Sequence, residues 1–172
     1  PTRRLTLRYG ENPHQEASLT VPEHPDGDLA GVGLHQHGGK ALSYNNLVDL
    51  IAAVKLVADV GDPCCGIIKH TNPCGLGLGE PVDALQRALL CDPVSAFGGI
   101  FAFNRAVDLA GAEALAGRFL EVVAAPAFTE DALARLRRRK NLRVMTWDPA
   151  VFPAATGSRG RTWGRLHLEQ TE

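Results

Sequence analysis

The clearest hydrophobic pattern in the chain is a helical stripe in its first third. The stripe consists of Leu47, Leu50, Ile51, Val54, Val57 and Ala58. Their spacing of three to four residues is that of one face of an α-helix. Asn45 or Asn46 precedes the stripe, where an N-cap side chain accepts from backbone amides, and Pro63 lies beyond its end. We therefore predict a helix that begins near residue 46 and ends before residue 61.

Short apolar runs and amphipathic stretches alternate along the rest of the chain. The strands that we predict are residues 64–68, 97–103, 119–124, 142–146 and 162–170, and the helices are residues 81–90, 109–117 and 129–140. Such alternation is typical of a mostly parallel sheet with helices on its faces. We expect a single α/β domain with three layers, α/β/α. It divides into a loop-rich arm (1–40), an α/β core (41–148) and a loop with a final strand (149–172).

Composition and charge exclude several classes of protein. Of the 172 residues 45% are hydrophobic, and 18 basic residues against 19 acidic ones give a net charge of −1. A dedicated nucleic-acid binder would be basic, and no apolar run approaches the roughly 18 residues that span a bilayer. The basic run at residues 135–140 ends a predicted helix, where cations complement the helix dipole. We expect neither nucleic acid nor membrane as a partner.

The cysteines and histidines give no metal-binding pattern. The four cysteines are Cys64, Cys65, Cys74 and Cys91, and none forms a C-x-x-C pair. The chain begins without Met and without an apolar leader. We therefore expect a cytoplasmic protein with reduced thiols that starts inside a longer gene product or after processing. His35 and His37 would share one face of a strand, yet two ligands are a weak basis for a metal site. We predict no metal.

Three polar clusters with Gly or Pro lie where loops would join strands. In the first, Lys69 and His70 follow an apolar strand and could supply a cationic proton donor and a base that titrates near neutrality. A surface lysine beside a hydrogen-bonded histidine explains the same pair. The second contains Arg8, a planar fork suited to phosphate or simply a surface residue. The third contains Gly98, where backbone amides could approach a ligand or the chain could simply bend. The residues alone leave each pair of alternatives open.

Four blocks, in this order, resemble the PurH family of bifunctional purine-biosynthesis enzymes. The blocks are residues 7–15 (LRYGENPHQ), 42–47 (LSYNNL), 68–75 (IKHTNPCG) and 92–100 (DPVSAFGGI). They are similar to the transformylase region of the family, which formylates 5-aminoimidazole-4-carboxamide ribonucleotide (AICAR). The likeness continues through residues 119–126 and 140–144, so it covers nearly the whole chain.

The resemblance implies formyl transfer from 10-formyltetrahydrofolate, as cosubstrate, to the 5-amino group of AICAR. It implies that His70 is the base for the amine and that Lys69 is its electrostatic and proton-donating partner. The positions that match substrate-binding residues of the family are Arg8, Tyr9, Asn46, Phe97, Gly98 and Glu121. It also implies a cytidine-deaminase-like fold and a homodimer.

Two departures from the family pattern bear on activity. Ile51 occupies a position that is usually polar in the family, often Asp. The family's transformylase region is also longer, with a second related half that completes the folate and phosphate sites, and a cyclohydrolase domain precedes it. The alternative function is therefore a catalytically silent nucleotide-binding or assembly module that needs the second half. A zinc-dependent nucleoside deaminase is a third interpretation, which the lack of an H-x-E partner disfavours.

Overall fold

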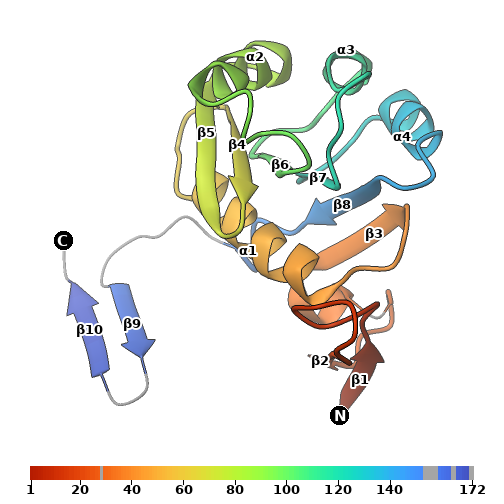
Figure 1. Ribbon diagram of the computed structural model, residues 1–172, viewed down its shortest axis with the longest axis vertical. Helices are drawn as coiled ribbons and strands as arrows, with labels where there is room; N and C mark the ends of the chain where they lie inside the picture. The colour runs from red at the N-terminus through yellow and green to blue at the C-terminus, as the bar shows by residue number, and fades with distance from the viewer. Residues whose placement is uncertain (28, 153–158, 164–165, 171–172) are drawn as a thin grey trace.

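The computed structural model describes residues 1–27, 29–152, 159–163 and 166–170 (Figure 1). Its centre is a sheet of six strands in the order β3-β8-β7-β6-β4-β5. The strands are β3 (Leu34–Gly38), β4 (Cys64–Lys69), β5 (Asn72–Leu78), β6 (Ile100–Phe103), β7 (Val122–Ala125) and β8 (Arg143–Trp147). The fold class is thus α/β, as predicted.

The sheet is mixed, so the prediction of a mostly parallel sheet is wrong. Only the β6–β7 and β7–β8 pairs are parallel, whereas β3–β8, β4–β6 and β4–β5 are antiparallel. The sequence pattern did not predict β5, which forms a hairpin with β4 and must therefore run against it.

Glycines explain why β5 carries no strand-like hydrophobic pattern. A Cβ atom at Gly75 would collide with the backbone carbonyl of Ala88, and one at Gly77 with that of Ala84. Helix α2 (Pro81–Cys91) thus packs directly on the backbone of β5. The Gly-Leu alternation of residues 75–79 allows this close packing.

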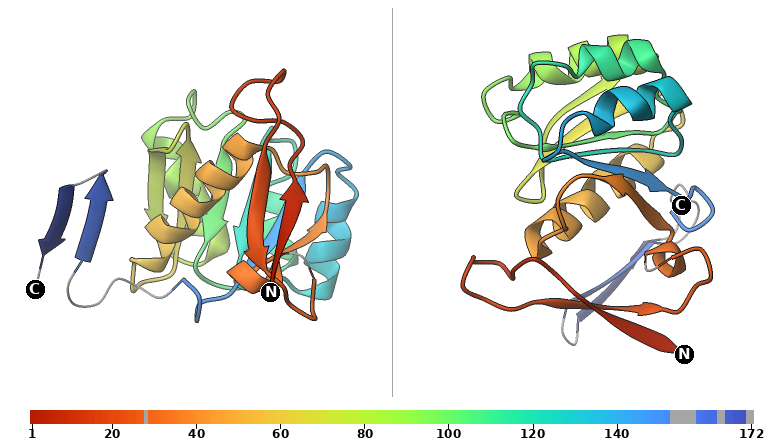
Figure 2. Two further views of the ribbon diagram at one scale, coloured as in Figure 1. Left: turned by 90° about the horizontal axis from the view of Figure 1, so that it is seen from below. Right: turned by 90° about the vertical axis from the view of Figure 1, so that its right-hand side faces the viewer.

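Helices cover both faces of the sheet (Figure 2). Helix α1 (Tyr44–Ala58) lies on one face, and α2, α3 (Leu109–Ala114) and α4 (Glu130–Arg137) lie on the other. The inner strands β4, β6 and β7 are buried on both sides. In β6, Phe101 and Phe103 face the three-helix side, whereas Ile100 and Ala102 face α1. The likeness to the cytidine-deaminase fold stays a prediction. Among the described helices, none combines the length and the apolar composition needed to cross a bilayer.

The first 40 residues hold more regular structure than predicted. Strands β1 (Thr2–Thr6) and β2 (Ser18–Pro22) form an antiparallel hairpin, and a 3-10 helix (Ala30–Val32) leads into β3. Strand β3 belongs to the central sheet, so the predicted arm contributes an edge strand to the core. Only Leu34 of that strand is buried. An edge strand with one buried side chain lacks the apolar run on which the prediction depended.

Helix α1 begins at a different cap from the one predicted. Ser43 is the N-cap: its Oγ accepts from the Asn46 amide at 3.2 Å, and the Asn46 Oδ1 accepts from the Ser43 amide at 3.1 Å. This reciprocal pair is a capping box. It replaces the predicted caps Asn45 and Asn46, and it holds the Asn46 side chain against the buried side of the helix.

The C-terminal prediction is partly corrected. Instead of one strand over residues 162–170, the structure has β9 (Arg159–Trp163) and β10 (Leu166–Gln170), which pair antiparallel. Residues 153–158 of the predicted loop and residues 164–165 lie outside the described residues.

Buried thiols on β4 predict a loss of stability at alkaline pH. Burial raises the pKa of Cys64 from 9.0 to about 11 and that of Cys65 well above 9.0. An unfolded chain ionises these thiols near pH 9 while the native protein keeps them neutral. The free energy of unfolding, measured in urea, should therefore fall as pH rises above 9. A Cys64→Ala, Cys65→Ala variant should show a shallower fall, and equal slopes would contradict the burial of these thiols.

Candidate active site

The strand register brings the predicted site to one end of the neighbouring strands β4, β6, β7 and β8. Ile68 of β4 pairs with Ile100 of β6, Ile100 with Val122 of β7, and Val122 with Arg143 of β8. Strands β6, β7 and β8 begin at this end, whereas β4 runs antiparallel to β6 and ends there. The segments after β4 and before β6 and β7 therefore meet, although the motifs that they carry are far apart in the sequence.

Lys69 and His70 lie in a tight turn between β4 and β5. Lys69 pairs with Asn72, so His70 and Thr71 are the two loop residues, with φ of 52° and 61°. Positive φ at both loop residues is the feature of a type I′ turn. His70 is exposed. The Lys69 Nζ donates a hydrogen bond of 2.8 Å to the Phe97 carbonyl, which joins the Lys-His pair to the third motif.

Phe97 and Gly98 form an exposed aromatic corner next to Lys69. The Phe97 ring lies 4.9 Å from the Phe119 ring, centroid to centroid, and 65% of the Phe97 residue surface is exposed. Gly98 has a φ of 74°, which favours glycine, and its amide donates to the Phe119 carbonyl at 2.9 Å. This corner presents an apolar face on which a planar ring could stack.

Asn46, Glu121 and Arg143 form a polar network beside this corner. The Asn46 Nδ2 donates to the Glu121 Oε2 at 2.7 Å, and the Arg143 Nη1 lies 3.7 Å from the same oxygen. Arg143 is only 3% exposed, and its Nε and Nη2 both donate to the Ala41 carbonyl. Burial lowers the pKa of Arg143, and the charge of Glu121 opposes that shift. The network fixes the Glu121 carboxylate at this end of the strands.

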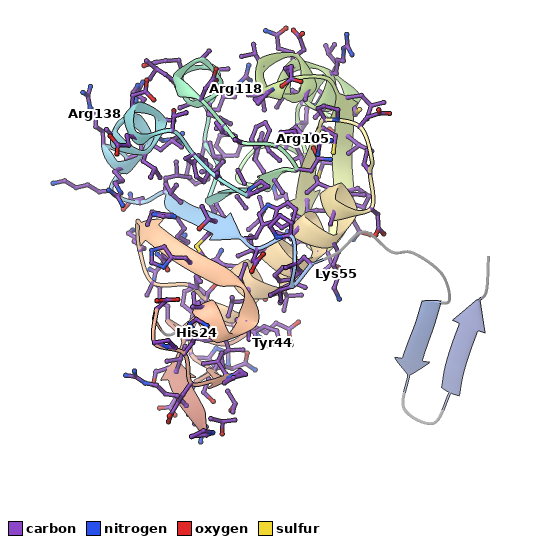
Figure 3. The ribbon with its side chains drawn as sticks, turned by 180° about the vertical axis from the view of Figure 1, so that it is seen from behind. His24, Tyr44, Lys55, Arg105, Arg118 and Arg138 are labelled. Atoms are coloured by element: carbon purple, nitrogen blue, oxygen red, sulfur yellow. The ribbon has the colours of Figure 1, made fainter. Side chains whose placement is uncertain are left out.

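Main-chain hydrogen bonds hold the segment with Arg8 and Tyr9 near the site. The Arg8 amide donates to the Leu42 carbonyl at 2.9 Å, and the Tyr44 amide donates to the Tyr9 carbonyl at 3.0 Å. The Arg8 guanidinium lies 5.2 Å from the centroid of the Tyr9 ring. Tyr44 lies near the N-terminal hairpin (Figure 3). The Arg8 block is thereby attached to the start of α1, close to Asn46.

The predicted residues thus fall into two neighbouring groups. Lys69, His70, Phe97 and Gly98 form one, and Arg8, Tyr9, Asn46 and Glu121 form the other. The Glu121 amide donates to the Gly99 carbonyl at 3.2 Å and links the two. The sequence pattern did not single out Arg143. The available signal was a charged residue at the start of an apolar strand. A charged residue in that position is usually exposed, so it did not indicate a buried site residue.

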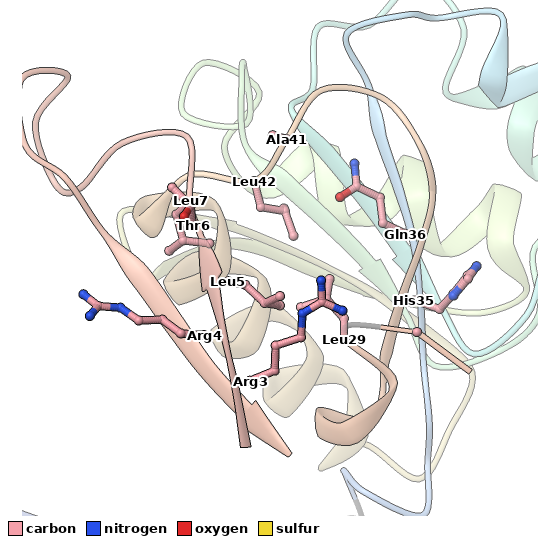
Figure 4. Close-up of a pocket in the computed structure, with 11 residues that line it drawn as sticks. Arg3, Arg4, Leu5, Thr6, Leu7, Leu29, His35, Gln36, Ala41 and Leu42 are labelled. Carbon is pink, nitrogen blue, oxygen red and sulfur yellow. The ribbon is translucent and has the colours of Figure 1, made fainter. Parts of the chain in front are cut away.

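One hollow of the N-terminal arm lies away from the predicted site residues. It has a volume of about 590 Å³ between the β1–β2 hairpin and β3 (Figure 4). Its lining includes Arg3, Leu5, His35 and Leu42 but none of the predicted site residues. The candidate site is instead an open surface at the ends of the strands, where His70 and Phe97 are exposed.

His35 and His37 lie next to each other without forming a larger cluster of ligands. Their rings are 4.5 Å apart, centroid to centroid, and the His37 Nε2 is 3.0 Å from the Thr146 Oγ1. Burial, together with the charges of His35 and Arg137, lowers the pKa of His37. Within the described residues, no group of three or more His, Cys, Asp or Glu side chains could hold a metal ion.

Comparison with known proteins confirms the family resemblance. The model of the AICARFT/IMPCHase bienzyme family matches residues 2–172. The chain is 45% identical, over 158 residues, to the bifunctional purine biosynthesis protein PurH of Lacticaseibacillus casei, covering 91% of this chain and 31% of that protein. It is 47% identical, over 161 residues, to PurH of Acidithiobacillus ferrooxidans, covering 92% of this chain and 28% of that protein.

These similarities define the class of protein as an enzyme family of purine biosynthesis. The chain belongs to the AICARFT/IMPCHase bienzyme family. It spans less than a third of the length of these curated relatives.

Proposed function

We propose that this chain supplies the Lys-His pair and part of the nucleotide site for formyl transfer from 10-formyltetrahydrofolate to AICAR. One observation carries the proposal: the Lys69 ammonium is bound to the Phe97 carbonyl, while His70 stands exposed one residue further along the same turn. A charged donor, an exposed imidazole and an aromatic face thus lie at the same end of the strands. Family membership supplies the substrate class.

The chemistry requires two proton transfers. The 5-amino group of AICAR is a poor nucleophile because its lone pair is delocalised into the imidazole ring and the carboxamide. As its nitrogen bonds to the formyl carbon, His70 takes the amine proton. The Lys69 ammonium stabilises the oxyanion of the tetrahedral intermediate. The bond from the formyl carbon to the folate nitrogen then breaks, and Lys69 gives that nitrogen its proton.

The other site residues would hold the nucleotide. Arg8 offers a planar, permanently charged fork to the phosphate, and Phe97 offers a stacking face to the imidazole ring. The Glu121 carboxylate, held by Asn46 and Arg143, would accept a hydrogen bond from the substrate. Tyr9 and the backbone of Gly98 would border the same space.

A second candidate function is a nucleotide-binding or assembly module that is silent alone. The open site and the small share of the relatives' length favour it. An open surface at the strand ends offers contacts to a nucleotide, but it does not exclude water or orient a second substrate. The remaining groups would come from the second half of the transformylase region or from a second copy of the chain.

We expect this chain to bind AICAR detectably and 10-formyltetrahydrofolate poorly. The reason is that the motif residues of the chain match the nucleotide side of the site. Isothermal titration calorimetry with each ligand separately tests this, with Arg8→Ala as the variant that should weaken AICAR binding and His24→Ala as a matched control on the arm. Tight folate binding without AICAR binding would contradict the proposal.

A further inference from the structure

The turn that carries His70 has an unusual backbone conformation. Both loop residues have positive φ, 52° at His70 and 61° at Thr71. Two-residue hairpin loops of this kind strongly prefer Asn, Asp or Gly. A β-branched residue such as Thr is an outlier in the left-handed region. The residue types in this turn therefore disfavour the conformation that the turn adopts. We infer that a contact from outside the turn stabilises this conformation.

That contact comes from Asp49 on α1. Its Oδ2 accepts a hydrogen bond from the His70 amide at 3.1 Å, and its Oδ1 accepts from the Thr71 amide at 2.7 Å. One carboxylate thus binds both amides of the two-residue loop. Hydrogen bonds to an ionised acceptor are stronger than neutral ones.

The position of Asp49 is fixed by the core. The next residue, Leu50, is fully buried between α1 and the sheet, and Ala53 and Val54 are also fully buried. Helix α1 is in turn anchored by its capping box at Ser43. The carboxylate is therefore carried by a rigid element, unlike the exposed turn that it binds.

Side chains within the turn bind the His70 carbonyl. The Thr71 Oγ1 and the Asn72 Nδ2 both donate to the His70 carbonyl, at 2.7 and 2.8 Å. The amide of His70 is thus bound by α1, and its carbonyl by the turn itself. The backbone of His70 has little freedom left, which fixes where the imidazole leaves the chain.

We propose that Asp49 is a positioning residue: its carboxylate holds the His70–Thr71 turn in the left-handed conformation and so directs His70 and Lys69 toward the substrate. The catalytic part of this statement rests on the function proposed above, whereas the hold on the turn does not. Asp49 acts through the backbone, with both of its oxygens bound to main-chain amides.

Compensation by glycine provides the sharpest test. Glycine adopts positive φ without steric cost, so Thr71→Gly should relieve the need for Asp49. In the full product of the gene, Asp49→Ala should lower kcat about 100-fold, the scale expected for a misplaced catalytic group, with little change in the KM for AICAR. Asp49→Asn keeps one acceptor oxygen and should fall between. The Asp49→Ala, Thr71→Gly variant should recover at least about tenfold in kcat.

A second readout does not depend on activity. In this chain, hydrogen exchange at the His70 and Thr71 amides, followed by NMR, should accelerate at least about tenfold in Asp49→Ala. Lys55→Ala, on the exposed side of α1, is the matched control and should leave both amides unchanged. Far-UV circular dichroism checks that each variant is folded.

The outcomes separate the two proposals. Unchanged exchange in Asp49→Ala would overturn the hold of Asp49 on the turn. Faster exchange without any recovery of kcat by Thr71→Gly would overturn positioning, because it would mean that the carboxylate acts on the substrate. Absence of formyl transfer in the wild-type gene product would instead refute the proposed function, and the exchange experiment would still decide the role of Asp49 in the turn.

Discussion

Replacement of His70 by alanine in the full product of the gene is expected to lower kcat for AICAR formylation by about 10²- to 10⁴-fold, the range for loss of a general base. His70 is exposed and follows Lys69, whose ammonium binds the Phe97 carbonyl; it is the one histidine of this motif, residues 68–75. The rate is measured as formation of formylated nucleotide at saturating AICAR and 10-formyltetrahydrofolate.

His24→Ala is the matched control for this experiment. His24 lies on the N-terminal arm (Figure 3), where it faces Asp26 at 3.6 Å. Its removal should leave kcat unchanged. If His70→Ala retains the wild-type rate, His70 is not the base. If it changes only the KM for AICAR, His70 binds the substrate without taking its proton.

The second large effect is on stability. Gly77→Val is expected to lower the free energy of unfolding by about 3 kcal/mol, at the upper end of the overpacking range. Strand propensity alone predicts the opposite, since valine favours strands and glycine does not. A side chain at position 77 would collide with the backbone of α2 at Ala84 and Ala88. Urea denaturation followed by circular dichroism measures the change.

Leu78→Val on the same strand is the control. Leu78 is the last residue of β5 and is 44% exposed. Its replacement should change the free energy of unfolding by less than about 0.5 kcal/mol, as is usual at surface positions. If Gly77→Val were as stable as the wild type, α2 would not pack on the backbone of β5 as described.

Part of this fold follows directly from the hydrophobic pattern. The predictions of α1, α2, α3, α4, β4, β6, β7 and β8 are confirmed within a few residues. Each of them buries a face, and burial imposes a period on the sequence. Strands β3 and β5 were missed because they form the edges of the sheet. Strand β3 packs on the core through one buried leucine, and β5 packs on α2 through alternating glycines. Neither strand needs an apolar pattern for this packing.

The site was less accessible to sequence reasoning. The residues alone leave Lys69 and His70 as either a reactive pair or a surface lysine beside a hydrogen-bonded histidine, and the catalytic roles proposed for them come from the family resemblance. The convergence of the motifs depends on the strand register, which no local pattern encodes. Asp49 escaped notice because it binds backbone amides of a distant turn. Its one signal was its place three residues after Asn46, about one turn further along α1.

The most direct test of the central claim compares formyl transfer by this chain alone with transfer by the full product of the gene, at saturating AICAR and 10-formyltetrahydrofolate. In the function that we propose, the chain contributes the Lys-His pair and part of the nucleotide site. We therefore predict transfer by the full product and a rate at least about 100-fold lower for the chain alone, because positioning groups are missing. Absence of transfer by the full product, or equal rates for the two, would contradict this account.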